Sequence, residues 1–334
     1  MNTAIDARMK NKSGIGTYIK NLMAHINYDV ILDELNFPCK NYGIREQLFF
    51  PYGKLRKKKI DVLHVPHLNI PIFYRGKLIV TIHDLTHLRY PRFLRSKLHH
   101  FYFKFMIGTA VRKASKVLTD SLSTKKDIIE FFNAEPDKIK VIPLGVGKEF
   151  VIRPQNEISY LCEKYNIPHD KKIILYVGNL LPHKNLKALL KAFNLIGGCV
   201  LILVGKSFND RSEQTAEQSS IIYAGEVSQN ELVDLYNLAD LFVLPSLYEG
   251  FGLPVLESMA CGTPVACSNV SSLPEVGGDR AFYFDPKNEN DIADTIKKAI
   301  EWSGDKLALR EYALRFSWEK TAKETLDEIN SIAG

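Results

Sequence analysis

The sequence is poor in the features that mark secreted, membrane-spanning and zinc-binding proteins. Its 334 residues include only five cysteines, an odd number with no C-x2-C spacing, so neither a disulfide framework nor a metal site is expected. No apolar run is long enough to cross a bilayer, and Asp6 and Arg8 interrupt the amino terminus before the apolar core of a signal peptide could form. We therefore expect a cytoplasmic protein.

Two nucleotide-binding fingerprints are also incomplete. Gly205-Lys-Ser207 ends like a P-loop, but Val200 stands where the first glycine of that motif is required. The dinucleotide fingerprint G-x-G-x-x-G lacks its third glycine after Gly16 and again after Gly252. The sequence therefore favours neither nucleotide hydrolysis nor a dinucleotide-dependent dehydrogenase.

The chain does have the composition and the pattern of a folded α/β protein. Hydrophobic residues make up 46% and charged residues 25% of it, and its length suffices for two domains. Short aliphatic runs alternate with segments of helical period, which predicts parallel sheets covered by helices. The expected strands cover residues 4–6, 62–65, 78–82, 116–119, 140–142, 173–177, 200–204, 221–224, 241–244 and 264–267.

The joint between the domains is expected at residues 143–154, where glycines and a proline follow a strand. The predicted fold is α/β, with two Rossmann-like domains, residues 1–150 and 151–316, whose parallel sheets face a central cleft. Open sheets of this kind bind ligands at the carboxyl ends of their strands. Candidate site residues are therefore those that directly follow strands.

The segment Pro245–Glu257 contains a glycine-rich turn between a strand and a helix. The turn, residues 249–253, follows an expected strand, and Pro254 opens the helix at a position where its missing N–H costs little. Free amides at Gly252 and Leu253, together with the positive end of the helix dipole, favour an anionic diphosphate. The turn is therefore a candidate phosphate site.

Two carboxylates, Glu249 and Glu257, flank this turn, and Gly250 and Phe251 complete it. Carboxylates can accept hydrogen bonds from sugar hydroxyls. One loop would then bind both the phosphate and the sugar part of a nucleotide sugar. The alternative is an exposed loop acid and a helix-surface acid placed near a helix dipole.

A second candidate phosphate contact follows the expected strand at 173–177. Lys184 lies near the start of the next helix, where the dipole disfavours a cation unless an anion is close. That local cost suggests contact with phosphate. Asn179 lies in the same loop and is a further candidate substrate contact.

Two loops in the first half also follow strands. His83 and Asp84 stand at a strand's carboxyl end, where they would reach a cleft; a histidine that satisfies a buried carbonyl is the alternative. Gly14 and Gly16, in a loop that begins at Ser13, would let the backbone approach a phosphate closely. A tight turn is the alternative for this loop.

The order acid, glycine-rich turn, proline, acid resembles the E-x7-E signature of retaining GT-B glycosyltransferases, often numbered family 4. The resemblance implies that Glu249 contacts the transferred sugar and Glu257 the ribose of the nucleotide. The string around His83 and Asp84 is similar to the family's T-x-H-D segment, whose histidine lies beside the transferred sugar. The carboxyl-terminal helix expected over 317–334 would, by the same resemblance, cross back to the first domain.

The loop around Lys184 resembles the family's G-x-x-x-P-x-K-N stretch, whose lysine pairs with the diphosphate. Many relatives have arginine where this chain has Asn179. A charge-assisted contact is worth about 1.5–3 kcal/mol, so Lys184 and the loop amides would hold the phosphates without that help. The loop of Gly14 and Gly16 resembles the family's amino-terminal loop, which touches the sugar or the diphosphate.

The resemblance implies a retaining hexosyltransferase with Glu249, His83 and Lys184 as catalytic residues. Its donor would be a GDP- or UDP-linked sugar, with mannose slightly favoured, and its acceptor a saccharide or lipid-linked saccharide in cell-surface polysaccharide or glycolipid synthesis. No cofactor is expected, and the absence of a D-x-D string speaks against the metal-dependent glycosyltransferases. A nucleotide-sugar epimerase and a non-catalytic nucleotide-sugar-binding subunit stay open as alternatives.

The net charge of +6 is concentrated in the first half, in Lys54–Lys59 and in a stretch from Arg89 to Lys116 that includes Arg95. Aromatic residues over 93–105 lie among these cations, as in a helix on an anionic membrane surface. Peripheral contact with such a membrane is one interpretation, and a core helix with a solvated basic face is the other. Nucleic acid is not an expected partner, because no helix-turn-helix, zinc-finger or RNP-like string accompanies the charge.

Overall fold

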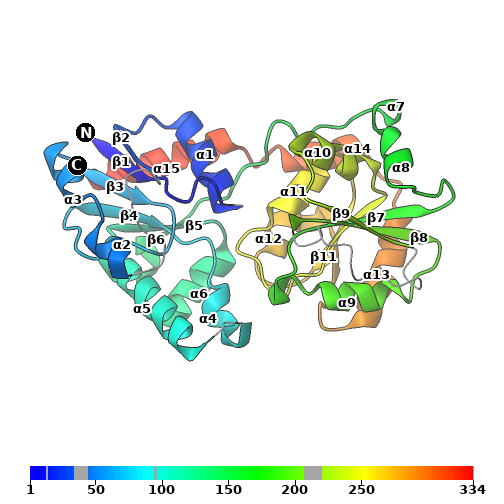
Figure 1. Cartoon of the computed structure of the whole chain (residues 1–334), viewed down its shortest axis with the longest axis horizontal. Coiled ribbons are helices and arrows are strands. Elements are labelled where there is room, and N and C mark those ends of the chain that lie inside the picture. The colour runs from blue at the N-terminus through cyan, green and yellow to red at the C-terminus, as the bar shows by residue number, and fades with distance from the viewer. Residues whose placement is uncertain (13, 34–43, 94–95, 207–219, 334) are drawn as a thin grey trace. The chain divides into compact units, whose positions relative to one another are not determined.

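The computed structural model describes residues 1–12, 14–33, 44–93, 96–206 and 220–333. Three residues named above, Ser13, Arg95 and Ser207, lie outside this part of the chain. The chain divides into two compact units, Met1–Gly145 with Ser317–Gly334 and Val146–Phe316, each built in its described residues on one parallel six-stranded sheet (Figure 1). The predicted fold class, two Rossmann-like α/β domains, is confirmed.

The amino-terminal unit has the strand order β2-β1-β3-β4-β5-β6. Its strands are β1 (Thr3–Asp6), β2 (Val30–Leu32), β3 (Val62–Val65), β4 (Lys77–Thr81), β5 (Lys116–Thr119) and β6 (Ile139–Val141). Its helices are α1 (Ile15–His25), α2 (Ile44–Leu48), α3 (Tyr52–Lys57), α4 (Thr86–Arg89), α5 (Lys97–Lys113), α6 (Leu122–Phe132) and α15 (Trp318–Ala333), with 3-10 turns at Pro91–Phe93 and Pro136–Lys138. Strand β2, at the edge of the sheet, was not predicted from the sequence.

Successive side chains of these strands point to opposite faces of the sheet. Leu63 and Val117 belong to one buried cluster with residues of α5 and α6. Val62 and Leu118, each one position away, belong to another cluster with Ile329 of α15. The carboxyl-terminal helix therefore covers one face of this sheet, where it lies beside α1 (Figure 1).

The carboxyl-terminal unit has the strand order β12-β11-β10-β7-β8-β9. Its strands are β7 (Lys172–Val177), β8 (Cys199–Val204), β9 (Ile221–Gly225), β10 (Leu241–Leu244), β11 (Val265–Ser268) and β12 (Phe282–Phe284). Its helices are α7 (Gln155–Ile158), α8 (Tyr160–Lys164), α9 (Leu186–Phe193), α10 (Gln229–Leu238), α11 (Leu253–Ala260), α12 (Leu273–Gly277), α13 (Glu289–Ile300) and α14 (Lys306–Ala313), with 3-10 turns at Pro182–Lys184 and Gly278–Arg280. Helices α9 and α13 pack on one face of the sheet, and α10 and α11 cover the other (Figure 1).

Each sheet contains a point where the order of the strands reverses. In the carboxyl-terminal unit this point lies between β7 and β10, which pair side by side although β8 and β9 separate them in sequence. The loops that leave these two strands diverge to opposite sides, and such switch points are where open α/β sheets bind ligands. The corresponding point of the amino-terminal unit lies between β1 and β3.

Candidate active site

An ion pair joins the two loops at the switch point of the carboxyl-terminal unit. Lys184, at the end of the loop after β7, places its Nζ 2.7 Å and 3.0 Å from the two carboxylate oxygens of Glu249, in the loop after β10. The Ser246 hydroxyl donates to the same carboxylate over 2.6 Å. Both charged side chains are largely buried, with 21% and 12% exposed. The structure thus brings two of the three predicted catalytic residues into contact.

This ion pair was not predicted from the sequence. The unfavourable cation near a helix start suggested a phosphate, but the carboxylate of Glu249 already balances Lys184. Backbone contacts fix the arrangement, because the Leu247 N–H donates to the His183 carbonyl over 2.7 Å. The side-chain amide of Asn185 also donates to the carbonyls of Pro245 and Pro286, over 3.1 and 2.7 Å. The two loops therefore form one unit of structure.

The glycine-rich turn after Glu249 requires glycine at its last position. Gly252 has φ of +110°, and a Cβ there would lie 2.7 Å from a methyl group of Leu273. The Ser272 hydroxyl lies 3.0 Å from the Glu249 carbonyl and 2.7 Å from that of Phe251, and so holds the turn. Helix α11 then begins at Leu253, with proline in its first turn as predicted. Its first amides point away from the helix, as at any helix amino terminus.

The remaining predicted residues of this unit have different surroundings. Glu257 accepts a hydrogen bond from the Tyr236 hydroxyl over 2.9 Å. Burial raises its pKa to about 7, the Tyr236 hydrogen bond lowers it, and Glu149 raises it. Phe251 is buried, with its ring against that of Phe316, so its side chain serves packing. Asn179 is half-buried, and its carbonyl accepts a hydrogen bond from the Tyr176 hydroxyl. Gly250, which directly follows Glu249, is also half-buried.

In the amino-terminal unit, His83 follows β4 and is held by a residue that the sequence analysis missed. Its Nδ1 lies 2.7 Å from the Asp120 carboxylate, and Asp120 follows the neighbouring strand β5. The Tyr18 ring, from α1, packs edge-on at 4.8 Å between centroids. Asp120 directly follows a strand, and that position is the signal in the sequence that could have identified it.

The other predicted residues of this unit take part in local turns. The Asp84 carboxylate accepts the Thr86 N–H, at the first residue of α4, over 2.8 Å. Gly14 is exposed directly before α1, and Gly16 is buried in its first turn. A Cβ at Gly16 would lie 2.6 Å from the Lys10 carbonyl oxygen, so this position requires glycine.

Comparison with known proteins identifies the family. The model of Glycosyltransferase Family 4 matches residues 14–150, and that of Glycosyl transferases group 1 matches residues 161–316. The chain is 32% identical over 288 residues to O-antigen chain mannosyltransferase B of Escherichia coli, covering 82% of this chain and 75% of that protein. The chain belongs to glycosyltransferase family 4.

This glycosyltransferase is also 31% identical to O-antigen chain mannosyltransferase RfbU of Salmonella typhimurium, over 76% of this chain and 69% of that protein. The crystal structure of Anabaena Alr3699/HepE in complex with UDP and glucose superposes with a TM-score of 0.77 at 18% identity, covering 99% and 100% of the two chains. At that identity the likeness supports the GT-B fold. Among the described helices, none combines the length and the apolar character that a membrane span requires.

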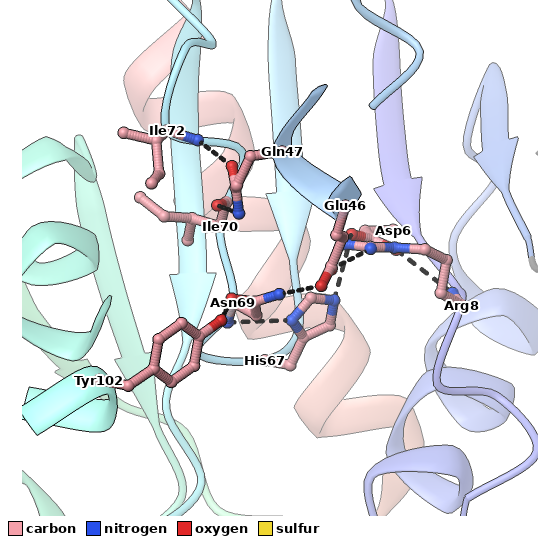
Figure 2. Close-up of polar contacts among 9 residues, drawn as sticks. All are labelled: Asp6, Arg8, Glu46, Gln47, His67, Asn69, Ile70, Ile72 and Tyr102. Atoms are coloured by element: carbon pink, nitrogen blue, oxygen red, sulfur yellow. Dashed lines mark hydrogen bonds and ion pairs between the residues drawn. The ribbon is translucent and has the colours of Figure 1, made fainter. Parts of the chain in front are cut away.

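A buried charge network supports the amino-terminal loop of the glycosyltransferase (Figure 2). Arg8, 1% exposed, donates to the Asp6 carboxylate over 2.8 and 2.5 Å and to Glu46 on α2. His67, in the loop after β3, lies 3.1 Å from Asp6, and Asn69 donates to Glu46. Burial raises the pKa of Asp6, but His67 and Arg8 outweigh burial and hold that pKa well below its usual range.

This network lies where the loops after β1 and β3 diverge. Figure 2 shows Asp6 and Arg8 converging with Glu46 and His67, and Tyr102 of α5 donates to Asn69 over 2.8 Å. The chain folds back directly after Arg8, since the Lys10 N–H donates to the Ala7 carbonyl. The network therefore fixes the segment that directly follows β1.

Proposed function

We propose that this glycosyltransferase transfers a mannosyl group, with retention, from a GDP- or UDP-linked donor to a saccharide or lipid-linked saccharide of a cell-surface polysaccharide. The contact of Lys184 with Glu249 at a switch point is the observation that carries the proposal. It is supported by two relatives that are named O-antigen chain mannosyltransferases and by a fold neighbour named in complex with UDP and glucose.

In the proposed donor site, positively charged groups face the diphosphate of the ligand and carboxylates face its sugar hydroxyls. Lys184 and the amides of Gly252 and Leu253 would face the diphosphate, where a cation and a helix amino terminus both stabilise growing negative charge. Glu249 would accept hydrogen bonds from hydroxyls of the transferred hexose, and Glu257 from those of the ribose. Because Lys184 and Ser246 both already donate to Glu249, little ordering is needed when the donor binds.

The proposed chemistry needs no protein base. A hydroxyl of the acceptor attacks the anomeric carbon from the face on which the diphosphate leaves, the bond from that carbon to the leaving oxygen breaks, and a phosphate oxygen takes the hydroxyl proton. Stabilising the leaving diphosphate then supplies most of the rate, as differential binding of the transition state requires. His83 would contact the hexose. We expect transfer to proceed without a metal and therefore to survive EDTA.

A transfer assay with matched ion-pair variants tests this proposal. Lys184→Met should lower kcat by about 100-fold or more, the usual loss when a donor to transition-state charge is removed. Lys191→Met is the control. Lys191, on α9, forms an ion pair with Glu289 at 2.7 Å, the same distance as the shorter Lys184–Glu249 contact, but its side chain is 66% exposed. The assay combines GDP-mannose, UDP-glucose and a mannose-terminated acceptor. Equal rates in the two variants would contradict the proposal, and conversion of the donor without acceptor would indicate an epimerase.

We further propose that α5 contacts an anionic membrane. Leu98, Phe101 and Phe105, spaced to share a helix face, are 76%, 68% and 49% exposed. Lys97 and Lys104 are exposed beside them, and the sequence has no acidic residue between positions 84 and 120. An apolar stripe with lysines beside it has the charge complementarity that an anionic lipid surface offers.

Sedimentation with vesicles tests the membrane contact. Vesicles of phosphatidylglycerol and phosphatidylcholine should bind the protein at low salt and release it at high salt. Phe101→Ser should weaken binding about tenfold, since an exposed phenylalanine gains about 1.5–3 kcal/mol when it is fully buried. Leu307→Ser is the control, because Leu307 on α14 is 62% exposed in the other unit. No binding at low salt, or equal loss in the control, would exclude this contact.

A further inference from the structure

A buried carboxylate, that of Asp120, lies next to the proposed catalytic histidine His83. Asp120 is 3% exposed and directly follows β5, while His83 follows β4 after one intervening residue. These strands pair in parallel, so both side chains leave the same edge of the sheet. Placing a carboxylate here costs free energy unless it is paired, because burial disfavours the charged form.

The His83 ring is fixed from several sides. Asp120 lies 2.7 Å from Nδ1, and the Tyr18 ring packs against the imidazole at an interplanar angle of 80°. The Tyr18 hydroxyl is itself 3.1 Å from that of Thr81, so its position is also set. The Thr124 hydroxyl donates to the His83 carbonyl over 3.3 Å, which holds the backbone.

The contact with Asp120 assigns different tasks to the two ring nitrogens. An ionised carboxylate can only accept, so Nδ1 of His83 carries a proton and donates it to Asp120. Nε2 is buried and makes no hydrogen bond of good geometry to the described residues, although the Pro66 carbonyl is near enough to raise the pKa of the ring. Leaving a buried polar atom unsatisfied costs about 1–3 kcal/mol, so such an atom calls for an explanation.

We propose that Asp120 is a positioning residue that acts through His83, holding Nδ1 so that Nε2 is presented to a hydroxyl of the transferred hexose. The inference rests on the proposed function, which places His83 beside that hexose. It adds the residue that orients the histidine, in the way that carboxylates orient histidines in metal sites and catalytic triads.

The charges around His83 support this arrangement. Burial lowers the pKa of His83, but Asp120, Asp84 and the Pro66 carbonyl raise it, and the net direction is upward. The other titratable groups that face the ring are Tyr18 from α1 and His64 from β3. Removing the charge of Asp120 should therefore lower the pKa of His83 and shift the acid limb of the pH–rate profile toward lower pH.

A double-mutant cycle on transfer separates this role from a merely structural one. Asp120→Asn keeps the size of the side chain and should lower kcat about 10- to 100-fold, the range typical when the partner of a functional histidine is lost. In the His83→Gln background the same change should have almost no further effect. Asp127→Asn is the control, because Asp127 is a buried acid of the same unit that pairs with Arg89.

A second readout does not depend on transfer. Proton NMR titration of the His83 ring should give a higher pKa in the wild-type protein than in Asp120→Asn. Equal pKa values, or equal losses of kcat with and without His83, would overturn the inference. A wild-type protein that transfers no hexose would instead overturn the proposed function and the hexose contact of Nε2, while the titration would still decide whether Asp120 controls the ring.

Discussion

Replacing Glu257 by glutamine should make the stability of the carboxyl-terminal unit less dependent on pH. Burial raises the pKa of this glutamate from 4.5 to about 7, against the hydrogen bond from Tyr236 that lowers it, and Glu149 raises it further. The folded state therefore favours the neutral acid. Glutamine stays neutral at every pH and has nearly the same shape, so the variant removes the ionisation alone.

The size of the effect follows from the two pKa values. The difference between 4.5 and about 7 corresponds to about 3 kcal/mol, at 1.36 kcal/mol for each pKa unit. Because the folded pKa lies above the unfolded one, stability from this group is fully present below pH 4.5. It is lost as the pH rises to about 7 and is constant above that. Relative to the parent, Glu257→Gln should gain about 2.5 kcal/mol between pH 5 and pH 8.

The two tryptophans allow this to be measured for one unit within the whole chain. Trp302 lies in the carboxyl-terminal unit and Trp318 in the amino-terminal one, so in a Trp318→Phe background the fluorescence reports only the former. Urea unfolding at pH 5 and pH 8 would compare the parent with Glu257→Gln. Glu311→Gln, at an exposed position of the same unit, is the control. A stability difference that does not change with pH would refute the reasoning.

The same carboxyl group links pH to the proposed donor binding. Ribose hydroxyls that donate to Glu257 would favour its ionised form, so nucleotide affinity should rise with pH up to about 7 and then level off. Calorimetry in two buffers of different ionisation enthalpy would detect the proton released on binding at pH 6. Binding without proton release there would contradict the ribose contact.

Three further changes test the local geometry. Gly252→Ala should destabilise the protein by about 1–2 kcal/mol, because the positive φ at this position disfavours residues other than glycine. Gly197→Ala is the control and should be neutral, because there is open space around an added Cβ. Equal melting temperatures of the two variants would contradict this. Arg8→Met removes the cation that pairs with two buried carboxylates, Asp6 and Glu46, and should cost about 3–5 kcal/mol in urea unfolding. A loss below about 1 kcal/mol would show that this cation contributes little to stability. Ser246→Ala removes a hydrogen bond to Glu249, worth about 1.5–3 kcal/mol, and should slow transfer about tenfold, whereas an unchanged rate would show that Ser246 is not needed.

Much of the fold could be predicted because buried parallel strands appear as short aliphatic runs. Strands β3, β5 and β10 have the predicted bounds, and several others differ by one residue at an end. The short strands β2 and β12 were not predicted. The order of the strands, and with it the switch point that joins Lys184 to Glu249, does not follow from such runs.

The sequence proposes candidate site residues most readily where they stand next to one another in the chain, and it does not show contacts between distant ones. The motif from Glu249 to Glu257 is continuous in sequence, and its helix begins at Leu253, one residue before the predicted start at Pro254. The contact of Lys184 with Glu249 spans 65 residues, and that of His83 with Asp120 spans 37. Pairs so far apart are set by which strands become neighbours. Sequence alone therefore suggests candidate residues but not the contacts between them.

Titration calorimetry with GDP and with UDP tests the central claim most directly, because it asks whether Lys184 and the glycine-rich turn hold a diphosphate. We predict that one of the two nucleotides binds at a single site, and that Lys184→Met weakens this binding at least tenfold while Lys191→Met leaves it unchanged. No binding of either nucleotide, or equal affinity in the two variants, would contradict the account.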